Sequence, residues 1–203
     1  FSAGNTDVYG NTIAWVNQLA MPVTFTESGE IKSIAIYHEG GTGNLLLGVY
    51  SDLDGYPSAR LGITISTPIN STAGWQTIQL TSNVPVVSGQ KVWLSWVFQN
   101  NPGIRYTTGS PGRAASTSIW TKGMPSNFGT STIASTLYSI YCNYVVIPNQ
   151  LKDAIVSDSN SKNYSEIVFE NSINKGEKII PVENIVPETN EMNFVIYPNP
   201  AFS

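Results

Sequence analysis

Residues 90–99 read "QKVWLSWVFQ", a run whose alternating side chains are typical of a β-strand. Successive side chains of a strand point to opposite faces. We therefore expect one face of this run to enter a hydrophobic core, and that face carries Val92, Leu94, Trp96 and Phe98. The opposite face, which we expect to point outward, carries Trp93, Ser95, Val97 and Gln99.

Several other runs have the same character. Residues 29–41, "GEIKSIAIYHEGG", place Ile34, Ile36 and His38 on one face, with Ser33, Ala35 and Tyr37 on the other. The hairpin pairs that we expect are 29–41 with 44–52, across the glycine-rich turn at 40–43, and 62–70 with 74–80. Residues 103–109 and 137–147 complete a set of eight to ten strands.

Short β-prone runs separated by Gly, Asn, Asp and Pro are typical of an all-β domain. We predict a jelly-roll-like, two-sheet antiparallel β-sandwich over residues 1–147, followed by an extended acidic tail. Three tryptophans are expected in its core: Trp15, Trp75 and Trp96.

The distribution of charge predicts the domain boundary. Residues 1–147 hold six Lys/Arg and six Asp/Glu, so the formal charge of −4 lies in residues 148–203. All five tryptophans and sixteen of the seventeen glycines also precede Pro148. We interpret residues 148–192 as an acidic linker, in which 165–169 ("SEIVF") and 177–186 ("EKIIPVENIV") are β-prone.

Composition argues against several functions. A domain without net charge, followed by an acidic tail, does not favour nucleic-acid binding, which needs clustered Lys and Arg. No run approaches 18 apolar residues, so we expect no membrane-spanning segment. The single cysteine, Cys142, lies in an apolar run and is expected to be buried and inert.

We expect no catalytic activity. The single histidine, His38, would have to serve any Ser-His-acid triad, and no G-x-S-x-G motif accompanies it. The acids of the domain include pairs that turn chemistry explains: Glu27 and Glu30 flank Gly29 in a turn, and Asp52 and Asp54 lie in a tight loop where Asx side chains cap their own backbone. No organic cofactor is expected. A structural calcium ion is the ion that the residues favour, with Asn5 and Asp7 of "GNTDVYGN" as candidate ligands.

A candidate binding region lies in residues 100–129, where Gly and Pro interrupt the chain and predict loops at the edge of the sandwich. Sugar recognition uses aromatic rings against the apolar faces of pyranoses, with planar polar groups on the hydroxyls. We propose Trp120 and Tyr106 as stacking rings and Arg105 and Arg113 as hydrogen-bond donors to hydroxyls or a uronate. The alternative is that Tyr106 and Trp120 close the ends of the sandwich.

The runs "LLLGVYSDLDGYPSARLG" (45–62) and "AGWQTIQLTSNVPVVSGQKVWLSWVFQNNPGIRYTTGSPGR" (73–113) resemble a β-sandwich module of secreted, multidomain bacterial proteins. Such modules often lie beside polysaccharide-degrading or adhesive domains and are treated as carbohydrate-binding-like. The resemblance covers about residues 5–146 and implies the fold, without a set of ligand contacts.

The last eleven residues, "NFVIYPNPAFS" (193–203), resemble the start of the C-terminal sorting domain of the type IX secretion system, whose first strand commonly carries "YPNP". This resemblance implies export across the outer membrane of a member of the Bacteroidetes, recognition by the type IX machinery, and a secreted or cell-surface location. It also implies that the natural chain continues past Ser203.

Two hypotheses for function remain open. The first is a non-catalytic extracellular module that binds a neutral polysaccharide or cell-surface glycan. The second is a structural adhesin or surface-filament subunit, in which the tail adds a strand to a neighbouring domain through segments such as "SEIVF" and "KIIPV".

Overall fold

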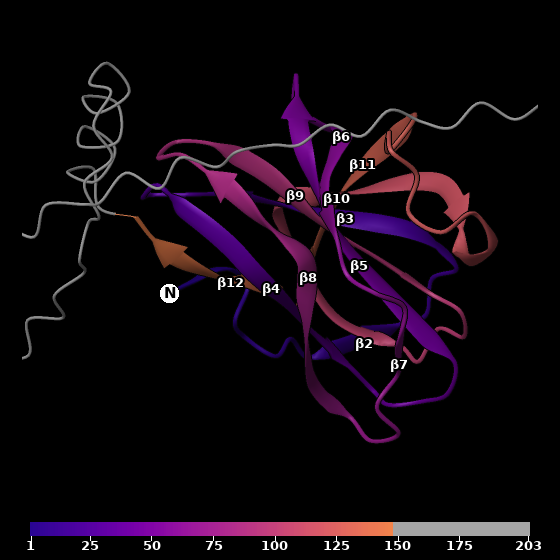
Figure 1. Cartoon of the computed structure of the whole chain (residues 1–203). Coiled ribbons are helices and arrows are strands. Elements are labelled where there is room, and N and C mark those ends of the chain that lie inside the picture. Colours follow the sequence, from indigo (N-terminus) through magenta and orange to yellow (C-terminus); the bar gives the residue numbers. More distant parts are fainter. Residues whose placement is uncertain (148–203) are drawn as a thin grey trace, which may run out of the picture. The chain divides into compact units, whose positions relative to one another are not determined.

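The computed structural model describes residues 1–147, and the predicted linker (148–192) and sorting-domain strand (193–203) lie outside the described residues. The described part is all-β, as predicted (Figure 1). Its elements, in chain order, are β1 (Ser2–Gly4), β2 (Asn11–Ile13), β3 (Asn17–Thr24), β4 (Gly29–His38), β5 (Asn44–Leu53), β6 (Tyr56–Ile63), β7 (Thr67–Pro68), β8 (Gly74–Val86), β9 (Lys91–Phe98), β10 (Ile104–Ile119), the 3-10 turn η1 (Trp120–Lys122), β11 (Ser131–Tyr138) and β12 (Ile140–Val146).

The strands form a sandwich-like arrangement in which every strand pairing among residues 1–147 is antiparallel. One layer has the order β1-β12-β4-β8, and Figure 1 shows its three long strands side by side. The second layer has the order β11-β10-β3-β9-β5-β6, with β2 added to β10 and β7 to β5. The pair Ile104–His38, between β10 and β4, connects the two layers into one continuous hydrogen-bonded sheet of twelve strands, and the isolated Thr64–Leu80 bridge is a further link between them.

The main hydrophobic core receives the inner face of β9, as predicted. Val92, Leu94, Trp96 and Phe98 are all at most 4% exposed and lie in one cluster with Ile34 and Ile36 of β4. Full burial of such a side chain stabilises the fold by about 1.5–3 kcal/mol. Trp96 also packs edge-on against Tyr138, with ring centroids 5.1 Å apart.

The outer face of β9 is buried too, which contradicts the expectation that it faces solvent. Trp93 and Val97 are 2% and 1% exposed, and Ser95 is fully buried, whereas Gln99 is exposed as expected. Trp93 and Val97 belong to a second cluster that also contains Tyr50, Met124 and Phe128. The segment after η1 therefore covers this face of the layer.

Hydrogen bonds hold the covering segment in place. The Tyr50 hydroxyl donates to the carbonyl of Pro125 at 2.8 Å, and the Phe128 N–H donates to the carbonyl of Ser58 at 2.8 Å. Arg60 donates to this segment through its backbone N–H and its side chain. The second cluster and these hydrogen bonds hold the segment from Trp120 to Phe128 in place.

Both expected hairpin pairings are wrong. β4 pairs with β8 and β12, whereas β5 pairs with β6, β7 and β9. The glycine-rich link at 39–43 crosses between the layers instead of turning back within one of them. Gly40 has a φ of 82° there, and a Cβ on it would lie 2.6 Å from the Ser71 carbonyl oxygen. Residues 62–70 and 74–80 share only the isolated Thr64–Leu80 bridge among the described pairings.

Residues 100–129 differ from expectation as well, because β10 runs through most of this region. Its register against β11 shifts between Thr108 and Arg113, so a bulge absorbs the residues between them. Glycine and proline thus interrupt the strand locally without ending it. Phe128, which belongs to the segment predicted to form edge loops, is 1% exposed.

His38 lies in the core, fully buried. Its Nδ1 accepts the Gly40 N–H at 3.1 Å, so Nε2 carries the ring proton and donates to Gln76 Oε1 at 2.8 Å. Burial lowers the pKa of His38 below its ordinary value of 6.5, partly offset by the Gln76 bond. This histidine is therefore held neutral.

Truncation of Phe128 tests the second cluster. The Phe128 ring meets Tyr50 edge-on at 5.2 Å, and we expect Phe128→Ala to lower the free energy of unfolding by about 3–5 kcal/mol. Urea unfolding measures the change, and Tyr56→Ala, at a ring 49% exposed, is the control that should stay within about 0.5 kcal/mol. A loss of less than about 1 kcal/mol in the free energy of unfolding for Phe128→Ala would show that the segment after η1 does not pack on this layer as described.

The neutral state of His38 predicts a pH dependence. Because the pKa of His38 is lower in the folded chain, the unfolded chain binds more protons. The contribution of His38 to the free energy of unfolding is therefore fully present above about pH 6.5 and is lost as the pH falls through the folded pKa. Urea unfolding between pH 5 and 8 measures this slope. The chain has no other histidine, so in His38→Gln the slope between pH 6.5 and the onset of carboxylate titration should disappear. An unchanged slope would contradict the assignment.

Candidate functional site

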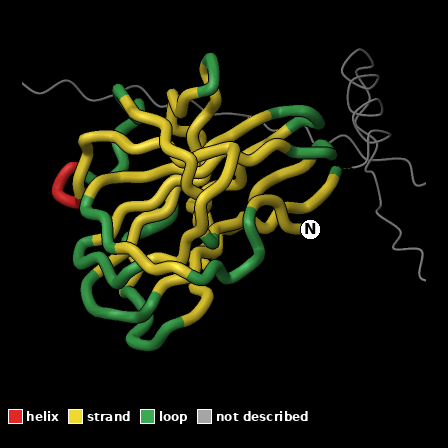
Figure 2. The backbone as a smooth tube through the Cα atoms, turned by 180° about the vertical axis from the view of Figure 1, so that it is seen from behind, coloured by secondary structure: helices red, strands yellow, loops and turns green. Residues whose placement is uncertain are grey.

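Trp120 opens the 3-10 turn at the point where β10 ends. The turn closes through Gly123, whose φ of 62° favours glycine and whose N–H donates to the Trp120 carbonyl at 2.8 Å. Figure 2 shows this turn at the periphery of the strands. Trp120 is half-buried and packs against the second cluster. It therefore combines a packing role with an accessible surface.

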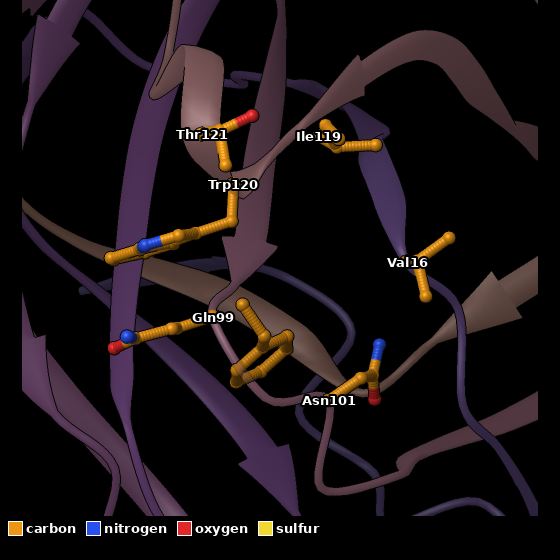
Figure 3. Close-up of a pocket in the computed structure, with 7 residues that line it drawn as sticks. Val16, Gln99, Asn101, Ile119, Trp120 and Thr121 are labelled. Atoms are coloured by element: carbon orange, nitrogen blue, oxygen red, sulfur yellow. The ribbon is translucent and has the colours of Figure 1, made fainter.

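The accessible side of Trp120 lines a pocket of about 430 Å³. Figure 3 shows Trp120 and Gln99 on one side of the opening, with Val16 and Ile119 on the other. All seven residues that line it are uncharged: Val16, Phe98, Gln99, Asn101, Ile119, Trp120 and Thr121. Aromatic and aliphatic walls with a few polar groups are typical of small-ligand sites.

Two amide side chains of the pocket are fixed by hydrogen bonds. Gln99 Oε1 accepts the backbone N–H of Asn44 at 3.1 Å and its Nδ2 at 3.0 Å. Asn101 donates through Nδ2 to the Trp15 carbonyl, while its Oδ1 accepts the Gly103 N–H at 2.9 Å. Because both bonds to Gln99 use its oxygen, the Nε2 group is the one placed to donate to a ligand.

Arg105 and Tyr106 lie on β10 and do not line this pocket. Arg105 forms an ion pair with Glu39, and its guanidinium lies 5.9 Å from the Tyr37 ring centroid. The Tyr37 and Trp75 ring centroids lie 5.7 Å apart, and those of Trp75 and Tyr141 lie 4.9 Å apart, so these three rings form an aromatic row across the layer of β4. Trp75 is half-buried and belongs to neither hydrophobic cluster, which corrects its assignment to the core.

Tyr106 packs inward, which is the position expected if it closes an end of the sandwich instead of stacking on a sugar. It lies against the main core, with its ring centroid 6.0 Å from that of Tyr138. The structure thus brings only Trp120, of the four proposed contact residues, to the pocket.

Arg113 lies over Trp15, with its Cζ 5.2 Å from the ring centroid. Its Nε and Nη1 are shielded from solvent and have no hydrogen-bond partner among the described residues. Burial raises the pKa of the Tyr138 hydroxyl, and the charge of Arg113 partly offsets that rise. The guanidinium therefore faces Trp15 and Tyr138. Trp15 itself is 38% exposed, which corrects its assignment to the core.

The candidate calcium ligands lie near the start of the chain. Asn5 donates through Nδ2 to the Tyr138 carbonyl at 2.9 Å, and Asp7 is exposed. Among residues 1–147, no group of three or more His, Cys, Asp or Glu is gathered as a metal site. Calcium takes six to eight oxygen ligands, and this pair of side chains supplies few of them. The calcium site stays a prediction.

The remaining candidates have structural positions. Asp52 Oδ2 accepts the Gly55 N–H at 3.2 Å, which confirms the predicted Asx turn, and Asp52 Oδ1 accepts from Trp93 Nε1 at 2.8 Å. Cys142 is fully buried, as predicted, and burial raises the pKa of its thiol to about 12. The thiol donates weakly to the Ala3 carbonyl at 3.5 Å.

Most of the pocket was missed by sequence reasoning. Val16, Gln99 and Asn101 come from two links, between β2 and β3 and between β9 and β10, that only the fold brings to Trp120. One usable signal was the polar run "QNNPG" directly after a buried strand, since planar amides in a turn suit hydroxyl recognition.

No protein-family model matches the chain, and no curated protein matches it by sequence. The described residues contain no helix long and apolar enough to cross a membrane. The uncharged pocket beside Trp120, with its two fixed amides, is the candidate site.

Proposed function

We propose that this module binds a neutral polysaccharide or cell-surface glycan in the Trp120 pocket, without catalysing a reaction on it. The observation that carries the proposal is the lining of the pocket, where an accessible indole and two hydrogen-bonded amides meet and every lining residue is uncharged. Sugars present an apolar ring face and planar sets of hydroxyls, and this lining complements both.

The apolar walls and the amide groups of the pocket contribute differently to the proposed binding. The accessible apolar walls, Trp120, Val16 and Ile119, remove the apolar face of a sugar ring from water, while Gln99 Nε2 donates to a hydroxyl. Because the Gln99 and Asn101 side chains are already held, little rotamer entropy is lost on binding. One stacked ring contributes roughly 0.5–1.5 kcal/mol beyond area burial, which suits a dissociation constant on the order of 10 µM to 1 mM.

The charge balance supports a neutral ligand. Residues 1–147 carry equal numbers of basic and acidic side chains, so no long-range field favours a polyanion. Export by the type IX secretion system, and a secreted or cell-surface location, remain part of the proposal through the "YPNP" resemblance at 197–200.

The replacement of Gln99 tests the amide directly. Glutamate keeps an oxygen acceptor for both Asn44 donors, removes the Nε2 donor and adds a charge. In affinity electrophoresis through gels that contain xylan, galactomannan, hydroxyethylcellulose or soluble starch, we expect at least one polymer to retain the wild-type protein. Gln99→Glu should weaken that retention at least about tenfold.

Matched controls separate the pocket from general effects of charge. Asn100→Asp adds the same charge at the neighbouring exposed residue, which does not line the pocket, and should retain wild-type binding. Trp120→Leu keeps an apolar side chain against the second cluster and should lose retention with a stability loss below about 2 kcal/mol. Retention by none of the polymers, or equal retention of Gln99→Glu and wild type, would refute the proposal.

Strand addition is a second candidate function, and one groove favours it. The groove has a volume of about 400 Å³ and runs along the edge of β8, lined by Ile65, Thr67, Thr77, Ile78, Gln79, Leu80 and Thr81. β8 pairs with β4 on its other side, and on this side the described bridges give it only Thr64–Leu80. An open edge of this kind can accept an added strand.

The groove predicts how such assembly would respond to a charge. Ile65 is 68% exposed on the groove wall, so Ile65→Asp should abolish any concentration-dependent growth in light scattering. It should leave glycan retention unchanged. Absence of such growth in the wild-type protein would exclude this second function. The proposed donor segments, 165–169 and 178–182, lie outside the described residues.

A further inference from the structure

Trp15 is an exposed tryptophan without a packing role in either described hydrophobic cluster. It lies in the link between β2 and β3, where Trp15 is 38% exposed and Val16 is 70% exposed. Ile119, on the same side of the pocket opening as Val16 in Figure 3, is 41% exposed. Contiguous exposed apolar side chains mark binding surfaces on soluble domains more often than scattered ones do.

Covalent and hydrogen-bonded contacts join Trp15 to the Trp120 pocket. The next residue, Val16, lines the pocket, and the Trp15 carbonyl accepts a hydrogen bond from Asn101, another lining residue. Adjacent Cα atoms are only 3.8 Å apart, so the backbone of Trp15 lies directly beside the pocket wall. The amide that borders the pocket also fixes the backbone that carries the second indole.

Arg113 supports the Trp15 ring from one face. Its guanidinium lies 5.2 Å from the ring centroid, and two of its nitrogens are shielded from solvent. A cation over one face of an indole restrains the ring. Trp15 is 38% exposed, and the face of its ring opposite Arg113 is the one on which a sugar would stack.

We infer that Trp15 forms a second subsite beside the Trp120 pocket, so that the protein binds two or more consecutive sugars of a neutral glycan. This inference rests on the proposed function and adds the length of the ligand to it. Arg113 is a positioning residue in this arrangement, since its guanidinium faces the Trp15 and Tyr138 side chains. Its role therefore differs from the direct contact with hydroxyls that the sequence suggested.

The test is the dependence of affinity on chain length. Isothermal titration of the full chain with xylo-, manno-, cello- and malto-oligosaccharides of one to six sugars gives this dependence for the series that binds. We expect wild-type affinity to rise about three- to tenfold between one sugar and three or four, as the second ring becomes occupied. Trp15→Ala should lose this rise and keep the affinity for the single sugar.

Two further variants guard against indirect effects. Trp15→Tyr keeps an aromatic face and should restore part of the rise, whereas Tyr56→Ala, at an exposed ring outside the pocket, should behave as the wild type. Trp120→Leu should weaken binding at every chain length. Indole N–H resonances provide an independent readout, because the Trp120 signal should shift with one sugar and the Trp15 signal only with longer chains.

The results distinguish a failure of the Trp15 subsite from a failure of glycan binding at Trp120. If Trp120→Leu abolishes binding while Trp15→Ala retains the rise with length, the second subsite is wrong and the Trp120 pocket stands. If Trp15→Ala weakens single-sugar binding equally, Trp15 belongs to the first pocket and the inference is wrong. If the wild type binds no sugar, the proposed function fails first. If Trp15→Ala instead removes self-association, the exposed surface is a protein contact and the subsite is refuted.

Discussion

Burial of β9 on both faces is the constraint on which the rest of the structure depends. Its inner face enters the main core with Trp96, and its outer face carries Trp93 and Val97 beneath Met124 and Phe128. A strand buried on both faces needs a covering layer on each side. Here one layer is the sheet of β4, and the other is the irregular segment after β10. Trp120 begins the segment that covers the outer face of β9, and this need for a cover determines its position.

The candidate site lies where this covering segment meets the end of β9. Phe98 closes the strand and lines the pocket, Gln99 and Asn101 follow it, and Trp120 begins the segment that returns over the layer. The same packing that stabilises the domain therefore brings an indole and two restrained amides together. A site on a supported segment is pre-organised, which reduces the entropy lost when a ligand binds.

The fold class and the inner face of β9 could be predicted from the sequence, because a two-residue period determines which side chains share a face. The period does not say what covers the opposite face, so Trp93 and Val97 were misassigned although their apolar character was a signal. The predicted pairing of 29–41 with 44–52 was wrong because the link at 39–43 crosses between layers. Only Trp120 of the site was predicted, since Val16 and Asn101 reach it through tertiary contacts. Trp15 shows that an aromatic residue in a short link need not enter the core.

The central claim is that the uncharged pocket beside Trp120 recognises a glycan, and amide chemical-shift mapping of the wild-type protein with a retained oligosaccharide tests it most directly. The account predicts saturating shifts at the Trp120 indole N–H and the Gln99 side-chain amide, with little change at the aromatic row of Tyr37, Trp75 and Tyr141 on the other layer. Shifts concentrated on that row, with Trp120 and Gln99 unmoved, would contradict the account and relocate the binding site.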